Sequence, residues 1–252
     1  MVVMMNKVYQ RMLDLSDYVS KDDKVRCLLG LGSISEKERL DQYSDIDFFL
    51  IVENGYKDKF IEKLDWLEVK PLVYVFRNTK DGYKALYHDG VFAEFAVFDE
   101  EEMKTARFTG GTVYYHKDDF DLELIQPKFE PKHKTVNVDF NVNEAMTNLY
   151  IGLLRDLRGE KSSAMTFIQS YAYGLVIELF PKVFEEEKIN IDPYVFERRI
   201  ERRFPNQLEL LKSMRQGIEH NKSSAKNILE FLNENFSVNQ EFYRHINDLI
   251  TI

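Results

Sequence analysis

The sequence is poor in cysteine, which excludes stabilisation of the fold by internal disulfides. Among 252 residues there is a single cysteine, Cys27, so no internal disulfide can form. Cys27 lies in the apolar run VRCLLGL, where a small buried thiol is ordinary. We therefore expect Cys27 to be a core residue and not a catalytic nucleophile.

Long apolar runs are also missing. No stretch reaches the roughly 20 residues that a membrane-spanning helix needs. The opening segment MVVMMNKVYQRMLDLSDYVSK carries Lys7, Arg11 and Asp14 at helical spacing, which is unlike a signal peptide. We therefore expect a cytoplasmic protein with no membrane partner.

Basic residues are outnumbered by acidic ones. The chain has 34 Lys and Arg against 43 Asp and Glu, a formal net charge of −9. A surface that neutralises nucleic-acid phosphates needs clustered Lys and Arg, so a nucleic-acid partner is not expected. This excess of acidic over basic residues favours a small or cationic partner.

The pattern of apolar residues changes along the chain. After a helical segment at residues 3–20, residues 25–98 contain short β-type runs, namely VRCLLGL, IDFFLIV, PLVYVF, YKALYH and VFAEFAVF, with one amphipathic helix candidate, KDKFIEKLDWLEV. The turn signal NTKDG, residues 78–82, predicts a hairpin between the third and fourth runs. From residue 139 onward every segment has helical periodicity.

This pattern predicts the fold class and the domain organisation. We expect an α+β domain with a mixed sheet at residues 1–115 and an all-α helical bundle domain at residues 139–252. Residues 116–138 have two prolines, mixed charge and little periodicity, so we interpret them as a connector.

Asp45 and Asp47 stand at the start of the apolar run IDFFLIV. Side chains alternate along a strand, so both carboxylates point to one face while Ile46 and Phe48 point into the core. At about 4 Å and an effective dielectric near 20, two such charges repel by roughly 4 kcal/mol, unless they are protonated, separated by water or bridged by cations. Carboxylates of this kind suit Mg²⁺, whose coordination is commonly completed by substrate phosphates.

Gly32 and Ser33 end the preceding strand, and eleven residues separate Ser33 from Asp45. A glycine there lets the backbone approach phosphate oxygens, and the Ser33 hydroxyl and amide can donate hydrogen bonds to them. In VFAEFAVF, Glu94 shares its face with apolar neighbours, where an unpaired buried carboxylate costs several kcal/mol. We therefore expect Glu94 to be the third member of the acidic cluster.

Two plainer interpretations of these residues compete with a nucleotide site. Taken alone, Asp45 and Asp47 fit a turn capped by carboxylates, which is common before strands. The presence of Gly32, Ser33 and Glu94 makes this turn interpretation less favoured. The run GLGSIS is close to the dinucleotide-binding motif G-x-G-x-x-G, which needs a full helix before the next strand. The eleven residues between Ser33 and Asp45 are too few and too polar for that helix, so we reject the dinucleotide interpretation.

These residues carry a resemblance to a known superfamily. Leu31-Gly32-Ser33, eleven residues, then Asp45-Ile46-Asp47-Phe48, with Glu94 as third acid, resembles the signature of the DNA polymerase β-like nucleotidyltransferases. GS followed by DQYSDID, then EFAVFDEEEM and LRGEKSSA, is similar to the two-domain lincosamide nucleotidyltransferase type.

The resemblance implies an activity and roles for the residues. It implies transfer of a nucleoside monophosphate from a Mg²⁺-bound nucleoside triphosphate to a hydroxyl of a small molecule, such as a lincosamide antibiotic. Gly32 and Ser33 would hold the triphosphate, and Asp45 and Asp47 the metal. Glu94 would be the general base and a further metal ligand. Arg158 could reach phosphate oxygens, although a cation at a helix C-terminus is favoured anyway.

Three points stay open in the sequence. The negative charge suits a cationic acceptor, so an aminoglycoside adenylyltransferase is the nearest alternative enzyme. A non-catalytic binding or antitoxin module of the same fold is a second alternative, although such modules usually lose carboxylates that this chain retains. A homodimer is compatible with the sequence, which does not show one.

Overall fold

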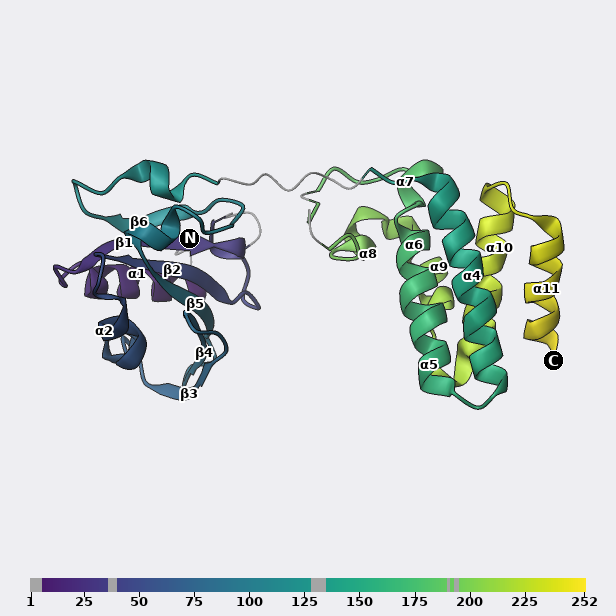
Figure 1. Cartoon of the computed structure of the whole chain (residues 1–252), viewed down its shortest axis with the longest axis horizontal. Coiled ribbons are helices and arrows are strands. Elements are labelled where there is room, and N and C mark those ends of the chain that lie inside the picture. The colour runs from purple at the N-terminus through teal and green to yellow at the C-terminus, as the bar shows by residue number, and fades with distance from the viewer. Residues whose placement is uncertain (1–5, 36–39, 128–134, 190, 193–194) are drawn as a thin grey trace, which may run out of the picture. The chain divides into compact units, whose positions relative to one another are not determined.

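The computed structural model describes residues 6–35, 40–127, 135–189, 191–192 and 195–252 (Figure 1). It divides into two compact units, Met1–Glu130 and Pro131–Ile252. Each unit has its own hydrophobic core, and the two units are described separately below.

The first unit is built on a six-stranded sheet with the order β3-β4-β5-β2-β1-β6 (Figure 1). The central strands β2 and β5 are parallel, and all other neighbours are antiparallel, so the sheet is mixed. The strands are β1 (Val25–Leu31), β2 (Ile46–Val52), β3 (Leu72–Arg77), β4 (Gly82–Tyr87), β5 (Phe92–Asp99) and β6 (Thr112–His116).

Helices and 3₁₀ turns accompany this sheet. They are α1 (Lys7–Val19), η1 (Gly32–Ser35), α2 (Lys57–Glu62), η3 (Asp65–Leu67), α3 (Glu100–Met103) and η4 (Leu122–Ile125). Helix α1 begins where the Asn6 side chain accepts a hydrogen bond from the Val8 amide, and α3 begins with a capping box between Asp99 and Glu102. Residues 3–5 of the expected first helix lie outside the described residues.

Alternation along the strands gives the sheet two apolar faces. Phe48 and Leu50 of β2 pack in a core with α1 and α2, while Ile51 packs in a second core with Met103 and Cys27. Phe48 stacks on Phe95 of β5, with ring centroids 5.1 Å apart. The central strands are therefore held from both sides, which fixes the positions of the polar side chains at their ends.

In the second unit, every regular element among the described residues is a helix. Its α-helices are α4 (Val138–Leu157), α5 (Lys161–Thr166), α6 (Tyr173–Ile177), α7 (Phe180–Val183), α8 (Ile200–Arg203), α9 (Leu208–Met214), α10 (Asn221–Asn235) and α11 (Gln240–Thr251). A π-helical segment, η5 (Phe167–Ala172), joins α5 to α6, and η6 (Pro205–Gln207) and η7 (Ile218–His220) precede α9 and α10. The expected fold class, a mixed-sheet α+β domain followed by an all-α unit, is confirmed.

Two segments differ from the sequence expectations. The strand β6 was not expected; it pairs with β1 and extends the sheet. The connector was expected at residues 116–138, but Phe120, Leu124 and Ile125 are buried in the first unit. In the sequence these apolar residues are spaced among acidic residues, so the pattern did not indicate that they are buried. None of the helices in the described ranges is long and apolar enough to cross a membrane.

The core of the first unit gives a stability prediction. Leu50 is fully buried, so Leu50→Ala should lower the free energy of unfolding by about 2–5 kcal/mol through lost burial and a cavity. Leu122→Ala, at a leucine that is 46% exposed in the same unit, should change it by less than about 1 kcal/mol. The only tryptophan, Trp66, packs against Phe48, so denaturant unfolding followed by its fluorescence reports on this unit. Equal effects of the two substitutions would contradict the assigned core.

Candidate functional site

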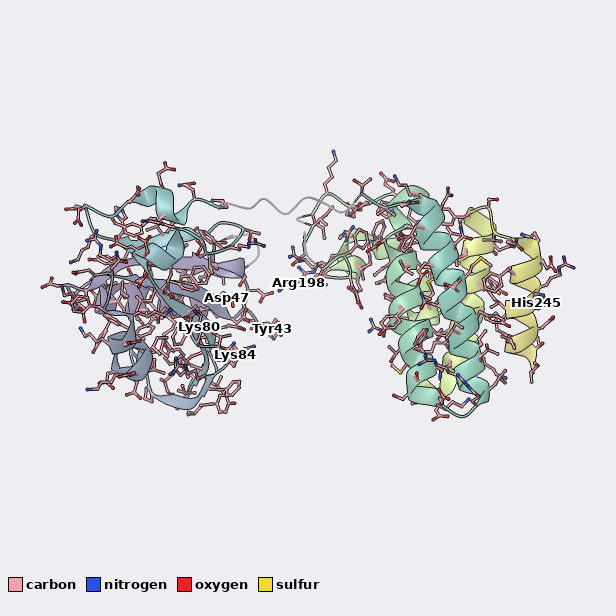
Figure 2. All side chains as sticks on the ribbon, in the orientation of Figure 1. Tyr43, Asp47, Lys80, Lys84, Arg198 and His245 are labelled. Carbon is pink, nitrogen blue, oxygen red and sulfur yellow. The ribbon has the colours of Figure 1, made fainter. Side chains whose placement is uncertain are left out.

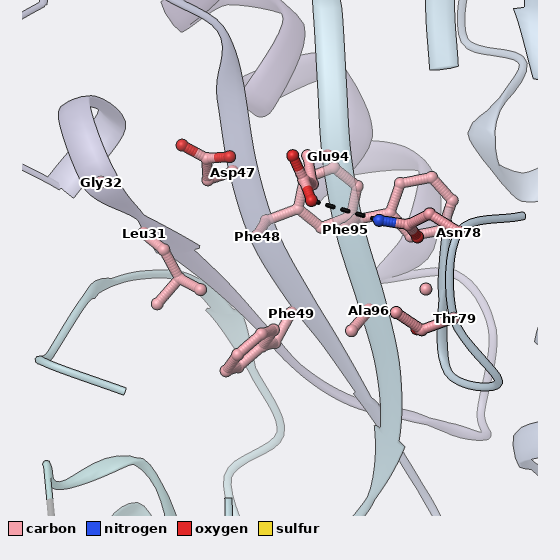
Figure 3. Close-up of a pocket in the computed structure, with 11 residues that line it drawn as sticks. Leu31, Gly32, Asp47, Phe48, Phe49, Asn78, Thr79, Glu94, Phe95 and Ala96 are labelled. Carbon is pink, nitrogen blue, oxygen red and sulfur yellow. Dashed lines mark hydrogen bonds between the residues drawn. The ribbon is translucent and has the colours of Figure 1, made fainter. Parts of the chain in front are cut away.

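Asp47 and Glu94 are direct neighbours on the two parallel central strands. In the register between β2 and β5, Asp47 stands opposite Glu94. Ile46 and Phe48, on either side of Asp47, are buried in the core, so Asp47 points to the opposite face of the sheet. Figure 3 shows the two carboxyl groups pointing out of the sheet to the same side. Asp47 and Glu94 therefore lie side by side on one face of the sheet, while their joint role in an acidic cluster stays a prediction.

Gly32 lies next to Asp47 on the side away from Glu94. It directly follows Leu31, which is paired with Asp47, and has a φ of +55°, a conformation that L side chains rarely adopt. A Cβ at this position would lie 2.7 Å from Oδ2 of Asp47, closer than contact distance. Only glycine therefore lets the chain turn here with the Asp47 carboxylate in place.

Ser33 follows in the turn η1. Its Oγ is buried and has no hydrogen-bond partner within the described part of the chain. A buried hydroxyl without a partner costs free energy, so a polar group bound at this turn would gain from it. Ser33 does not line the pocket beside Asp47, so its phosphate-binding role stays a prediction.

A pocket of about 380 Å³ opens beside the two carboxylates. Its apolar surface comes from Phe49, Leu31 and Ala96, and the hairpin turn after β3 lines one side (Figure 3). The lining residues are Leu31, Gly32, Asp47, Phe48, Phe49, Asn78, Thr79, Gly82, Glu94, Phe95 and Ala96.

Glu94 is held by two residues of the β3–β4 hairpin that sequence reasoning missed. Asn78 Nδ2 donates a hydrogen bond of 3.3 Å to Oε1, and Lys84 Nζ lies 3.1 Å from Oε2. Lys84 is also the direct cross-strand neighbour of Glu94 in the register between β4 and β5. The turn NTKDG between β3 and β4 carries Asn78, whereas the tight connection at residues 88–91 pairs β4 with β5 and brings Lys84 beside Glu94.

An ion-pair cluster fixes the turn that carries Asn78. Lys57 at the start of α2 contacts Asp81 in the turn, and its Nζ lies 2.7 Å from Oε1 of Glu102 in α3. Burial alone would lower the pKa of Lys57, but its hydrogen bonds to Asp81 and Glu102 outweigh burial and raise that pKa. Lys57 therefore stays charged and ties the turn to the helices.

Two predicted site residues are placed differently. Asp45 is exposed in the residue before β2 and does not line the pocket. Arg158 belongs to the second unit, where it ends α4 and its Nε lies 3.4 Å from Oε1 of Glu160. Its contact with a nucleotide stays a prediction.

The fit of this site to a divalent ion can be judged from its donors. Within the described ranges, no group of three or more His, Cys, Asp or Glu side chains is placed to hold a metal ion. Asp47 and Glu94 by themselves are two adjacent hard oxygen donors, and Mg²⁺ is often bound by one or two carboxylates together with water and phosphate oxygens. The pair therefore fits Mg²⁺, and the contribution of Asp45 stays a prediction.

Cys27 has the role expected from the sequence. It is fully buried in the second core of the sheet, and burial raises the pKa of its thiol to about 12. A thiol with this pKa is a poor nucleophile near neutral pH.

Comparisons with known proteins give the following similarities. No protein-family model matches the chain, and no curated protein matches it. Among solved structures, the chain is similar to an aminoglycoside 6-adenyltransferase from Bacillus subtilis, with 16% identity, a TM-score of 0.34, and coverage of 96% of this chain and 91% of that chain. It is also similar to a nucleotidyltransferase-like protein from Exiguobacterium sibiricum 255-15, with 10% identity, a TM-score of 0.31, and coverage of 91% and 75%.

The close approach of Gly32 to Asp47 gives a prediction with a matched control. Gly32→Ala should displace the Asp47 carboxylate and weaken Mn²⁺ binding, followed by electron paramagnetic resonance, at least about tenfold. Gly55 also has a positive φ, of +83°, but no atom lies within 4 Å of its added Cβ. Gly55→Ala should therefore lower the free energy of unfolding by about 1–2 kcal/mol through the same backbone strain. The affinity of this variant for Mn²⁺ should equal that of the wild type. Equal weakening by both substitutions would rule out the assigned role of Gly32.

Proposed function

We propose that this chain is a nucleotidyltransferase that moves a nucleoside monophosphate from a Mg²⁺-bound nucleoside triphosphate to a hydroxyl group of a small molecule. The observation that carries the proposal is the cross-strand pairing of Asp47 with Glu94. The glycine turn beside this pair is followed by a serine whose buried hydroxyl has no hydrogen-bond partner among the described residues. Carboxylates beside a phosphate-binding turn are what phosphoryl transfer requires.

The triphosphate would be bound by the turn after β1. The backbone of Gly32 can approach phosphate oxygens because it has no side chain, and the Ser33 hydroxyl can donate a hydrogen bond to one of them. Asp47, with Asp45 and Glu94, would hold Mg²⁺, which when bound neutralises charge on the phosphate oxygens. Asp47 is positioned for this by its buried neighbours in β2.

Glu94 is the proposed general base. The hydroxyl oxygen of the acceptor attacks the α-phosphorus and its proton passes to the Glu94 carboxylate. The bond from the α-phosphorus to the bridging oxygen breaks, and pyrophosphate leaves with the electron pair. Asn78 and Lys84 orient the Glu94 carboxylate through their contacts with its two oxygens.

The acceptor is proposed to be an antibiotic, either lincosamide-like or, as the alternative, an aminoglycoside. Both classes carry hydroxyl groups that can be modified. The pocket beside Asp47 and Glu94 is lined by both apolar and polar residues, as small-molecule sites usually are.

Mass spectrometry tests this proposal directly. Lincosamides and aminoglycosides are incubated with each nucleoside triphosphate and Mg²⁺, and we expect one product whose mass increases by a nucleoside monophosphate. Glu94→Gln should slow the reaction by about 10² to 10⁴ because the base is lost. Asp47→Asn should abolish Mg²⁺-dependent triphosphate binding.

Glu53→Gln is the control, because Glu53 follows the far end of β2 and pairs with Lys24 at 2.8 Å. It should leave the rate within about twofold. A wild-type protein without Mg²⁺-dependent binding of any nucleoside triphosphate would overturn the proposed function.

A further inference from the structure

Lys84 lies beside the two carboxylates of the proposed site, in a row that crosses three strands. In the register of the sheet, Lys84 of β4 stands opposite Glu94 of β5, and Glu94 stands opposite Asp47 of β2. Lys84 and Asp47 lie toward the same side of the first unit in Figure 2. One positive and two negative side chains therefore follow one another at the strand spacing of about 4.8 Å.

Both oxygens of the Glu94 carboxylate contact the protein itself. Asn78 Nδ2 donates a hydrogen bond of 3.3 Å to Oε1, and Lys84 Nζ lies 3.1 Å from Oε2. A divalent ion shared by Asp47 and Glu94 needs an oxygen of Glu94, because such hard cations bind carboxylates through oxygen. The Lys84 ammonium and the ion therefore compete for the same negative charge.

The ion pair between Lys84 and Glu94 is weak enough to be exchanged. The side chain of Lys84 is 38% exposed and that of Glu94 is 44% exposed. Ion pairs at such positions contribute little to stability, because water and salt screen them. A doubly charged ion gains more from the same place, since it interacts with Asp47 and Glu94 together.

The hairpin offers Lys84 no second acidic partner. Residues 72–87 contain one acidic residue, Asp81, and it contacts Lys57. An ammonium released from Glu94 therefore needs an anion that a ligand brings. The triphosphate proposed for the turn after β1 carries several anionic oxygens, and lysine binds such oxygens as a point charge.

The other basic side chains of the hairpin have different partners. Arg77 donates hydrogen bonds to the carbonyl oxygens of Thr79 and Lys80. Lys80 Nζ is exposed and lies 3.8 Å from Oδ2 of Asp81. Lys84 is therefore the basic residue of this hairpin that contacts the proposed catalytic carboxylate.

We propose that Lys84 is an exchangeable counter-ion of Glu94. In the ligand-free protein its ammonium neutralises Glu94. When the Mg²⁺-bound triphosphate enters, Lys84 leaves Glu94 and its ammonium contacts a phosphate oxygen, while Asn78 continues to orient Glu94. Lys84 thereby keeps the affinity for the metal alone low and makes metal and triphosphate bind together. This inference rests on the proposed function and deepens it, because it assigns to one residue the coupling of the two ligands.

The variant Lys84→Met tests the exchange, because methionine keeps an unbranched apolar stem and lacks the charge. Without triphosphate, the variant should bind Mn²⁺, followed by electron paramagnetic resonance, at least about fivefold more tightly than the wild type. With saturating Mn²⁺, calorimetry should show at least about fivefold weaker binding of the triphosphate that the wild type prefers among ATP, GTP, CTP and UTP. A merely structural role of Lys84 would weaken both affinities.

Lys80→Met is the matched control, because it removes the same charge from the same hairpin at a side chain that is 82% exposed. Both affinities of this control should stay within about twofold of the wild type. In a Glu94→Gln background, Lys84→Met should tighten Mn²⁺ binding by no more than about twofold, because the carboxylate for which the two cations compete is gone. Fluorescence of Trp66 confirms that each variant is folded.

Four outcomes would overturn the inference. They are Mn²⁺ binding by Lys84→Met that is unchanged or weaker, triphosphate binding by it that is unchanged or tighter, equal effects of Lys80→Met, and tightening that persists in the Glu94→Gln background. Each leaves the proposed function standing if the wild type binds a triphosphate with Mg²⁺. A wild type that binds no triphosphate in the presence of Mg²⁺ refutes the proposed function and, with it, the role of Lys84.

Discussion

The parallel pairing of β2 with β5 is the constraint on which the site depends. It places Asp47 directly opposite Glu94, and the strand spacing of about 5 Å at an effective dielectric near 20 gives a repulsion of roughly 3 kcal/mol between two carboxylates. The apolar side chains of both strands hold this arrangement from the two faces of the sheet. Lys84 offsets part of the repulsion through its contact with Glu94. A bound divalent ion would offset more.

The β3–β4 hairpin adds the second half of the site. Its turn supplies Asn78 to Glu94, its strand β4 supplies Lys84, and Lys57 anchors the turn through Asp81. The same hairpin exposes Tyr74 and Phe76 on the site face. One supersecondary element thus contacts both oxygens of the Glu94 carboxylate.

Much of this arrangement could be predicted from the sequence, because it follows from local rules. The alternation of side chains in IDFFLIV and VFAEFAVF predicted Asp47 and Glu94 on a single face of the sheet. The turn signal NTKDG predicted the β3–β4 hairpin. Lys84 and Asn78 were missed because their contacts depend on the register between strands, which is set by packing and not by local pattern. The strand β6 was missed because its pairing with β1 is long-range.

A double-mutant cycle on Asp47 and Glu94 tests the central claim that the two carboxylates bind one ion together. The affinity for Mn²⁺ is measured for the wild type, for Asp47→Asn, for Glu94→Gln and for the double variant. If both carboxylates ligate the same ion, each single substitution should lose most of the affinity that the double variant loses, a coupling of about 1 kcal/mol or more. Free-energy losses that simply add would contradict a shared ion.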